Sequence, residues 1–207
     1  MCLPSPSQWL LVCLASAQLV VYQVQAEWPP SSESTVQLLG VFHEYDNSSA
    51  TSWAAEMRAL FKAAMVLAGQ YNITVDGNPI GWQIAATGES DIDTLTRTCL
   101  AVSTAEVVGI VGPRTSREAL TVAGFAERIG IPVVSSTATN PDLSSRQAYP
   151  TFYRTVPSDG TTAWVLAGLF IRFNWTSCIV IYQNDAFGYG VYLFSSNADN
   201  CVRIFQL

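Results

Sequence analysis

The sequence predicts an α/β fold with a mostly parallel sheet, and three observations indicate it. From about residue 36 onward, apolar runs rich in Val and Ile alternate with helical patterns. The chain has 207 residues, 49% of them hydrophobic and 13% charged, which excludes a disordered segment and leaves room for one or two domains. The clearest unit is a strand over 107–111, a turn over 112–116 and a helix that ends at about Ile129.

The first two units before that point follow the same alternation. An apolar run over 36–42 predicts the first strand, and the spacing over 52–70 predicts a helix. Its expected core face consists of Trp53, Met57, Leu60, Phe61, Ala64, Leu67 and Ala68. Ala55, Ala59, Met65 and Val66 fall outside that face, so the helix offers a candidate surface for a dimer, although ordinary exposed alanines fit equally well. Residues 80–86 predict a second strand, and Asp91, Asp93 and Thr94 are expected to open the next helix.

After the central unit, residues 132–135 predict a fourth strand. A polar loop over 136–150 replaces the expected helix, and loops of that length in compact domains are usually functional. Residues 152–155 indicate a short strand or crossover, and a helix follows to about Phe173 with Ser158 or Asp159 as its cap. Strands are then expected over 177–182 and 202–207, with no helical period over 188–200. Because one or two strands cannot bury both faces of a second sheet, the chain is expected to end inside a domain.

The N-terminal residues 1–26 predict a secretory signal peptide. They contain no charged side chain, carry an apolar run and end in Val24-Gln25-Ala26, with small residues at the expected cleavage positions. An N-terminal anchor helix is the alternative, since Lys and Arg are missing near the start. No later apolar run approaches the ~18 residues that a membrane span requires. Secretion would give meaning to three N-x-[ST] sequences, so Asn47, Asn72 and Asn174 are candidate glycosylation sites.

Composition and motifs argue against several other functions. The chain has ten basic and sixteen acidic residues without a basic cluster, so nucleic acid and anionic membranes are poor candidate partners. His43 is the single histidine and is expected on the surface or in a loop, so neither a His-containing triad nor a His/Cys metal site is expected. Asp91 and Asp93 fit helix capping better than acid–base catalysis. No phosphate-binding or dinucleotide loop follows a strand, so no cofactor is expected.

Hydroxyl side chains gather where predicted strands end, which is where open α/β sheets bind their ligands. Thr115 and Ser116 open the helix after the third strand, where free backbone N–H groups favour a carboxylate or another anion. Four more follow the fourth strand, and Asp159 stands at the start of a later helix. The four are Ser135, Ser136, Thr137 and Thr139. Each could equally be a cap or turn residue, but together they outline a small polar site.

These segments carry a family resemblance. In order and spacing they are VGPRTS, IPVVSSTATNPDLSSRQAYPTFYRTVPSD and RFNWTSCIVIYQNDAFGYG. Together they resemble the extracellular ligand-binding region of receptors related to bacterial periplasmic amino-acid-binding proteins. LSSRQAYPTFYRT is especially similar to metabotropic GABA receptors, and the VPSD and NWT segments also resemble metabotropic glutamate receptors. The resemblance covers about residues 36–190 and implies a periplasmic-binding-protein-like clamshell. Its first lobe, a doubly wound mostly parallel sheet, would span 36–156, and a truncated second lobe would begin within 157–207.

The resemblance also implies a set of ligand contacts. Ser116 matches the hydroxyl that holds a ligand α-carboxylate, and Thr137 and Thr139 match contacts after the fourth strand. Asp159 matches an acidic contact to the α-amino group, and Phe187 stands where glutamate-type receptors have a tyrosine, so the ring is kept and its hydroxyl is lost. Cys99 lacks the neighbouring cysteine that commonly pairs in this superfamily. Much of the second lobe, the cysteine-rich segment and the transmembrane helices have no counterpart here.

The expected function is therefore extracellular binding of an amino acid or similar small molecule by a receptor of class C G-protein-coupled type. A receptor guanylyl cyclase or ionotropic glutamate receptor ectodomain is the alternative within the fold, and a secreted isoform that does no sensing is another. A secreted α/β enzyme belongs to a different class, and the missing nucleophile, metal and cofactor motifs argue against it. The expected location is the extracellular side of the plasma membrane or the medium, with homo- or heterodimers formed through the first lobe.

Overall fold

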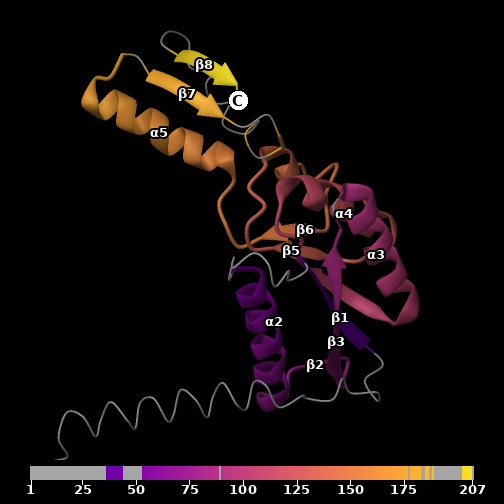
Figure 1. The fold of residues 1–207 in the computed structure, drawn as a ribbon. Helices are drawn as coiled ribbons and strands as arrows, with labels where there is room; N and C mark the ends of the chain where they lie inside the picture. The colour runs from indigo at the N-terminus through magenta and orange to yellow at the C-terminus, as the bar shows by residue number, and fades with distance from the viewer. Residues whose placement is uncertain are drawn as a thin grey trace, which may run out of the picture.

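The fold was examined in a computed structural model of the chain. It describes residues 36–43, 53–88, 90–176, 178–182, 185–186, 188 and 202–206. The predicted signal peptide, Asn47 and Phe187 lie outside the described residues. Figure 1 shows a larger body built around a central sheet and, beyond it, a helix beside two short strands.

The larger body is organised around a six-stranded sheet with the order β2-β3-β1-β4-β5-β6. All of its neighbouring strands are parallel except β2, which forms an antiparallel hairpin with β3. The sheet thus confirms the predicted α/β class with a mostly parallel sheet, while the β2 hairpin was not predicted. The strands are β1 (Val36–His43), β2 (Thr74–Val75), β3 (Asn78–Thr87), β4 (Val107–Val111), β5 (Val133–Ser135) and β6 (Phe152–Arg154).

Helices cover both faces of this sheet, as the doubly wound prediction requires (Figure 1). Helix α2 (Trp53–Gln70) lies on one face, where Phe61 and Met65 pack with Phe42 of β1. Helices α3 (Asp91–Thr104) and α4 (Ser116–Arg128) lie on the other face and cover the larger core. That core includes Leu39, Val41, Ile110, Ala119, Val122, Ala123, Ala126, Val133, Leu143 and Phe152. Two separate cores on opposite faces explain why β1 and β4 are apolar along almost their whole length.

Helix α2 is rotated relative to the predicted core face. Met65, which was expected on the outer surface, is only 8% exposed, whereas Leu60 and Leu67 are 65% and 49% exposed. Phe61 is buried as predicted and packs against Phe42 and Trp82, with ring centroids 5.4 and 6.1 Å apart. Periodicity alone misplaced the face because this helix is apolar on most sides, so the choice fell to the aromatic cluster it packs against.

The remaining elements of the larger body agree with the predictions to within a few residues. Strand β4 and the start of α4 fall where predicted, and the loop over 136–150 contains a short 3₁₀ helix, η1 (Pro141–Ser144). Ser90, rather than Asp91 or Asp93, caps α3, because its side chain accepts a hydrogen bond from Asp93 N. The two aspartates instead lie in the first turn, where the helix dipole favours negative charge.

The smaller body contains helix α5 (Asp159–Phe173) and the strands β7 (Cys178–Tyr182) and β8 (Val202–Gln206). The two strands pair in parallel as a separate two-stranded sheet. The predicted region over 188–200 lies outside the described residues, except for Gly188. Along the described part of the chain, no helix is long and apolar enough to cross a membrane.

Candidate functional site

The candidate site lies where the parallel strands β4 and β5 end. The turn after β4 requires a glycine at Gly112, because its φ is +102° and a Cβ there would lie 2.3 Å from Val41 O. Ser135 at the end of β5 donates a hydrogen bond to Pro113 O at 2.8 Å and accepts one from Ala138 N at 3.1 Å. One buried hydroxyl thus links the loops that follow two neighbouring strands, which brings the predicted site residues of both loops together.

Ser116 is buried at the start of α4, with 3% of its surface exposed. Its Oγ accepts a hydrogen bond from Asn140 N at 3.2 Å, so it connects α4 to the loop after β5. Thr115 is the N-cap and forms a capping box with Glu118. The backbone N–H groups of Thr115 and Glu118 therefore already donate hydrogen bonds within the capping box. A ligand anion at this helix end could bind them only by displacing those bonds.

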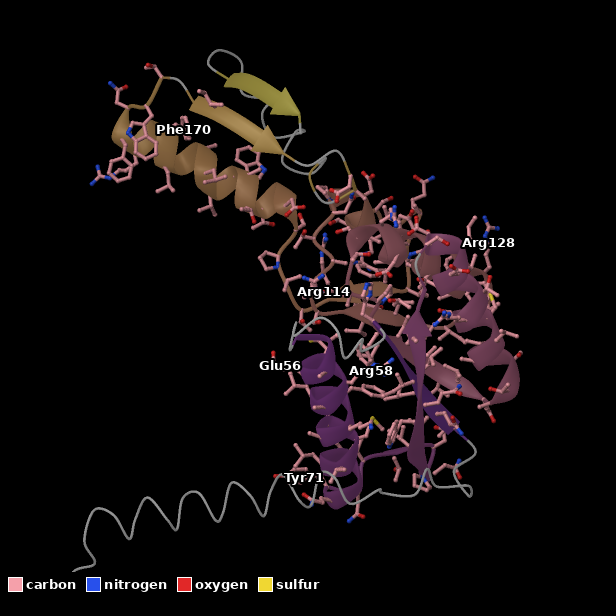
Figure 2. The ribbon with its side chains drawn as sticks, viewed as in Figure 1. Glu56, Arg58, Tyr71, Arg114, Arg128 and Phe170 are labelled. Carbon is pink, nitrogen blue, oxygen red and sulfur yellow. The ribbon has the colours of Figure 1, made fainter. Side chains whose placement is uncertain are left out.

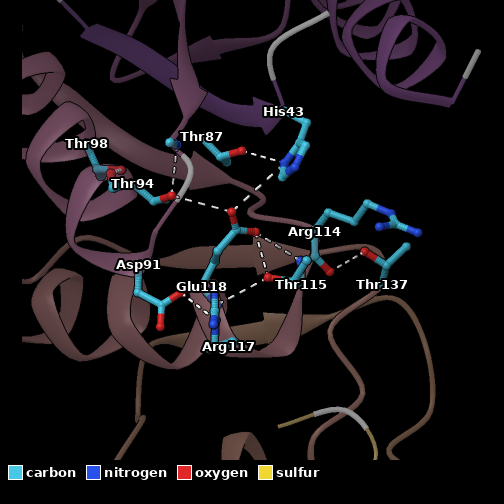
Figure 3. A network of polar contacts seen from close by, with 11 residues as sticks. His43, Thr87, Asp91, Thr94, Thr98, Arg114, Thr115, Arg117, Glu118 and Thr137 are labelled. Carbon is cyan, nitrogen blue, oxygen red and sulfur yellow. Dashed lines mark hydrogen bonds and ion pairs between the residues drawn. The ribbon is translucent and has the colours of Figure 1, made fainter. Parts of the chain in front are cut away.

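Thr137 is exposed on the same edge. Its Oγ1 donates a hydrogen bond to Arg114 O at 2.7 Å, which ties the loop after β5 to the turn after β4 (Figure 3). The hydroxyl oxygen keeps acceptor capacity beyond this bond. Thr137 therefore has a structural partner, and its exposure leaves it accessible to solutes.

Thr139 and Asp159 lie side by side, since Asp159 N donates a hydrogen bond to Thr139 O at 2.9 Å. Thr139 Oγ1 and Asp159 Oδ2 are both shielded from solvent, and neither has a hydrogen-bond partner within the described residues. Asp159 is the first residue of α5 and Ser158 is its N-cap, although the Ser158 side chain forms no capping hydrogen bond. The predicted cap at this helix thus falls on Ser158, and the Asp159 carboxylate is not held as a cap.

Arg154 of β6 supports the loop that carries Thr139. Its guanidinium donates hydrogen bonds to Ala138 O and Asn140 O, at 3.3 and 2.9 Å, and another to Ser144 Oγ. Burial lowers the pKa of the Arg154 guanidinium, and the Asp159 carboxylate opposes that shift. The Asp159 charge is thus partly balanced by a neighbouring cation that is committed to backbone carbonyls.

A second polar cluster centres on the buried carboxylate of Glu118 (Figure 3). Its Oε2 accepts hydrogen bonds from Thr115 N and Oγ1, at 3.3 and 2.7 Å, and its Oε1 accepts one from Thr94 Oγ1 at 3.4 Å. His43 is the last residue of β1 and its side chain is 43% exposed, so of the two expected places it has the surface one. Its Nδ1 lies 2.5 Å from Thr87 Oγ1 and 4.0 Å from Glu118 Oε1. This cluster was not predicted, although the T-x-x-E spacing of 115–118 is a capping-box signal that indicates part of it.

The Glu118 cluster connects strands and helices of the larger body. It joins the ends of β1 and β3 to the starts of α3 and α4, and Asp91 adds an ion pair to Arg117 at 2.8 Å (Figure 3). Among the described residues there is no group of three or more His, Cys, Asp or Glu side chains that could hold a metal ion. Cys99, the cysteine with a described side chain, is free and partly buried on α3.

Comparison with known proteins identifies the family. The sequence profile described as "Receptor family ligand binding region" matches residues 73–200, which is more than half of the chain. The chain belongs to this family. The match runs from just before β2 through α5 and into the smaller body, and it includes every predicted ligand contact. Residues 36–72, with β1 and all of α2, lie outside the matched range.

Several characterised receptors are similar to part of this ligand-binding region. It is 33% identical to Glutamate receptor 2.4 of Arabidopsis thaliana over 86 residues, which are 42% of this chain and 10% of that protein. It is 37% identical to Glutamate receptor 3.7 of the same plant over 83 residues, 40% of this chain and 9% of that protein. It is 34% identical to mouse Taste receptor type 1 member 3 over 94 residues, 45% of this chain and 11% of that protein. These alignments cover only about a tenth of each relative.

Proposed function

We propose that this ligand-binding region recognises an amino acid or a similar small molecule at the edge formed by the loops after β4 and β5. The observation that carries the proposal is the pair of unpartnered polar atoms, Thr139 Oγ1 and Asp159 Oδ2, in adjacent residues. Buried polar atoms in folded proteins nearly always have a partner, so two neighbouring orphans favour a ligand that supplies hydrogen bonds. An ammonium group is suited to this place, because it donates three hydrogen bonds and carries the charge that Asp159 attracts.

The opposite end of the ligand would face the start of α4. Ser116 Oγ accepts from Asn140 N but keeps its own hydrogen, so it can still donate to a carboxylate. Thr137 is exposed beside it and tied to Arg114 O. We also propose Phe187 as a contact from the second lobe, on the strength of the family resemblance of that segment. The distribution of groups favours a zwitterion, with its ammonium near Asp159 and its carboxylate near Ser116.

For the receptor type, we propose a class C G-protein-coupled receptor that binds its ligand without catalysis. The VPSD and NWT segments and the similarity to a taste receptor support this type. The similarity to two plant glutamate receptors favours a second candidate, an ionotropic glutamate receptor ectodomain. Sequencing the transcript beyond the codon for Leu207 separates them. Seven apolar spans would identify the first type, and a pore segment between spans would identify the second.

We propose that the chain is secreted or displayed outside the cell, with residues 1–26 as its signal peptide. Asn72 and Asn174 support this proposal, because both are exposed and occupy turns with positive φ, where an oligosaccharide has space. Removal of N-glycans from the secreted chain should lower its mass. This loss of mass should be smaller in Asn72→Gln and in Asn174→Gln than in the wild type. An unchanged mass in the wild type would contradict glycosylation at both sites and at Asn47.

The first lobe remains our proposed dimer surface, through the exposed side of α2. Ala55 and Ala59 of the predicted surface are exposed, but Met65 is buried in the core. Leu60 and Leu67 are exposed instead, together with Ala55, Ala59 and Ala64. An outward patch of this kind is typical of protein interfaces when a few charged residues surround it.

The ligand proposal is tested by calorimetric titration of the secreted chain with a panel of single amino acids. We expect at least one of them to bind. Asp159→Asn removes the charged contact and should weaken binding roughly 10- to 150-fold, and Thr139→Val removes a hydroxyl and should weaken binding less. Asp142→Asn is the matched control, because it makes the same change on an exposed carboxylate of η1. Absence of binding by the whole panel, or equal affinities for wild type and Asp159→Asn, would overturn the proposed site.

A further inference from the structure

Asn140 has an unusually complete set of partners for a loop residue. It lies between β5 and η1 and is 1% exposed. Its backbone N donates to Ser116 Oγ at 3.2 Å, and its backbone O accepts from Arg154 Nη1 at 2.9 Å. Its side-chain Oδ1 accepts from Asp142 N at 2.8 Å, and its Nδ2 donates to Ala186 O at 2.6 Å. The first three bonds stay within the larger body, and the fourth reaches a segment 46 residues away.

The partners determine which way the carboxamide points. Asp142 N can only donate, so the side-chain atom facing it must be the oxygen. Ala186 O can only accept, so the atom facing it must be the NH₂ group. The bond to Asp142 therefore fixes the amide plane and presents Nδ2 to Ala186 before that segment is in place. An orientation set in advance makes the contact stronger than a free side chain would give, because little rotamer freedom remains to be lost.

The same loop holds the smaller body at a second point. One residue earlier, Thr139 O accepts the hydrogen bond from Asp159 N, at the start of α5. The backbone of this loop is itself hydrogen-bonded to the guanidinium of Arg154 and to the hydroxyl of Ser116. Residues 138–140 thus contact both the entry into α5 and the segment after β7, while Arg154 keeps them rigid against β6.

We propose that Asn140 is a positioning residue that ties the segment after β7 to the loop carrying Thr137 and Thr139. Through this tie, movement of the smaller body changes the position of the loop at the candidate ligand edge, and movement of the loop changes the smaller body. The tie needs no ligand and would exist in the unliganded chain. It therefore goes beyond the proposed ligand recognition, and either can fail without the other.

The test is amide hydrogen exchange of the full secreted chain without ligand. Gly188 N reports on the tie, because Gly188 is buried and its N–H is bonded to Asp185 Oδ1 at 2.8 Å. Ile110 N, bonded to Pro132 O at 2.9 Å, reports on the sheet of the larger body. In Asn140→Asp, the turn acceptor for Asp142 N remains, but an oxygen replaces Nδ2 opposite Ala186 O. Exchange at Gly188 should rise at least tenfold, because a donor is lost and two acceptors face each other.

A second variant covers the case in which the new buried charge prevents folding. Asn140→Ser is neutral and can still accept from Asp142 N, but it is too short to reach Ala186 O, so exchange at Gly188 should rise about three- to tenfold. Gln147→Glu makes the amide-to-carboxylate change on an exposed side chain of the same loop and should leave both reporters unchanged. Unchanged exchange at Gly188 in Asn140→Ser would overturn the proposal. A parallel rise at Gly188 and Ile110 would also overturn it, because Asn140 would then support only the fold of the larger body.

Discussion

Helices α4 and α5 are similar in length but differ in how they are covered. In α4, one side is buried against the sheet, through Ala119, Val122, Ala123 and Ala126. In α5, Ala163 is the one buried residue among its described positions. Figure 2 shows α5 extending away from the larger body, with Phe170 labelled. The exposed apolar side chains of this helix include Trp164, Val165, Leu166, Leu169, Ile171 and Phe173.

The sheets explain this contrast. Helix α4 lies on a sheet of six strands, while α5 lies beside a sheet of two described strands. A helix that is apolar on every side is typical of the core of a large domain, where it is covered on several faces. An apolar sequence thus predicts a helix that requires burial, and the neighbouring elements decide whether it is buried. Within the described residues, the six-stranded sheet covers one side of α4, and the two-stranded sheet leaves most of α5 exposed.

The largest expected effect is on the free energy of unfolding, compared between two isoleucine truncations. Ile110 in β4 is 1% exposed and Ile171 in α5 is 82% exposed. Ile110→Ala should lower the free energy of unfolding of the larger body by about 2–5 kcal/mol, because it removes buried methyl groups and leaves a cavity. Ile171→Ala should change it by less than ~0.5 kcal/mol. Urea unfolding followed by far-ultraviolet circular dichroism measures both, and equal costs would remove the contrast between the two bodies.

A smaller effect is expected on self-association. Because Trp164 is 81% exposed within an apolar surface of α5, the secreted chain should associate reversibly through this helix. Trp164→Glu places a charge in that surface and should weaken association about tenfold or more, as measured by sedimentation velocity over a concentration series. Thr162→Glu is the control, since it adds the same charge at an exposed polar position of α5. Monodisperse wild-type monomer at all concentrations would contradict this use of the α5 surface.

The smallest effect concerns alkaline pH and tests the loop of the larger body. Burial raises the pKa of the Tyr149 hydroxyl above 10.0, and the Asp142 carboxylate adds to the shift. Since the folded state holds this proton more tightly than the unfolded state, the contribution is complete below about pH 10 and is lost as the pH rises through the raised pKa. Tyr149→Phe should therefore show a smaller loss of stability than the wild type as the pH rises from about 10 to about 12.

Urea midpoints across this pH range provide the measurement. Tyr71→Phe is the matched control, because it removes the same hydroxyl from a side chain that is 76% exposed. An identical alkaline loss in wild type and Tyr149→Phe would show that the tyrosine is solvated in solution and that the loop after η1 packs less closely than described.

Most of the larger body could be predicted from the sequence because its signals are local. The unit from β4 to α4 combines a five-residue apolar run, a glycine that the turn requires and a capping box, and its bounds were predicted almost to the residue. The face of α2 was predicted wrongly, because Met65 and Leu60 are both apolar and only packing against Phe42 and Trp82 decides between them. The β2 hairpin was missed because two residues carry too little pattern.

For the candidate site, the sequence identified residue types and strand ends but not the partners of each side chain. Ser116, Thr137, Thr139 and Asp159 lie at the predicted edge, yet the first two hydroxyls are bonded within the protein and the last two residues have orphaned atoms. Glu118 and Asn140 were not singled out. One partner of Glu118, Thr94, is 24 positions away, and one partner of Asn140 is 46 positions away, so no local pattern reveals these two contacts.

The sequence by itself determined the fold class, the order of the elements and the loops that carry the proposed ligand contacts, because alternating apolar runs, caps and required glycines act over a few neighbouring residues. Only the tertiary structure decided which side of α2 is buried, which hydroxyls are already bonded and how Asn140 reaches Ala186. These choices depend on contacts between residues far apart in the chain, where several arrangements satisfy the local pattern equally and packing and hydrogen bonding select one.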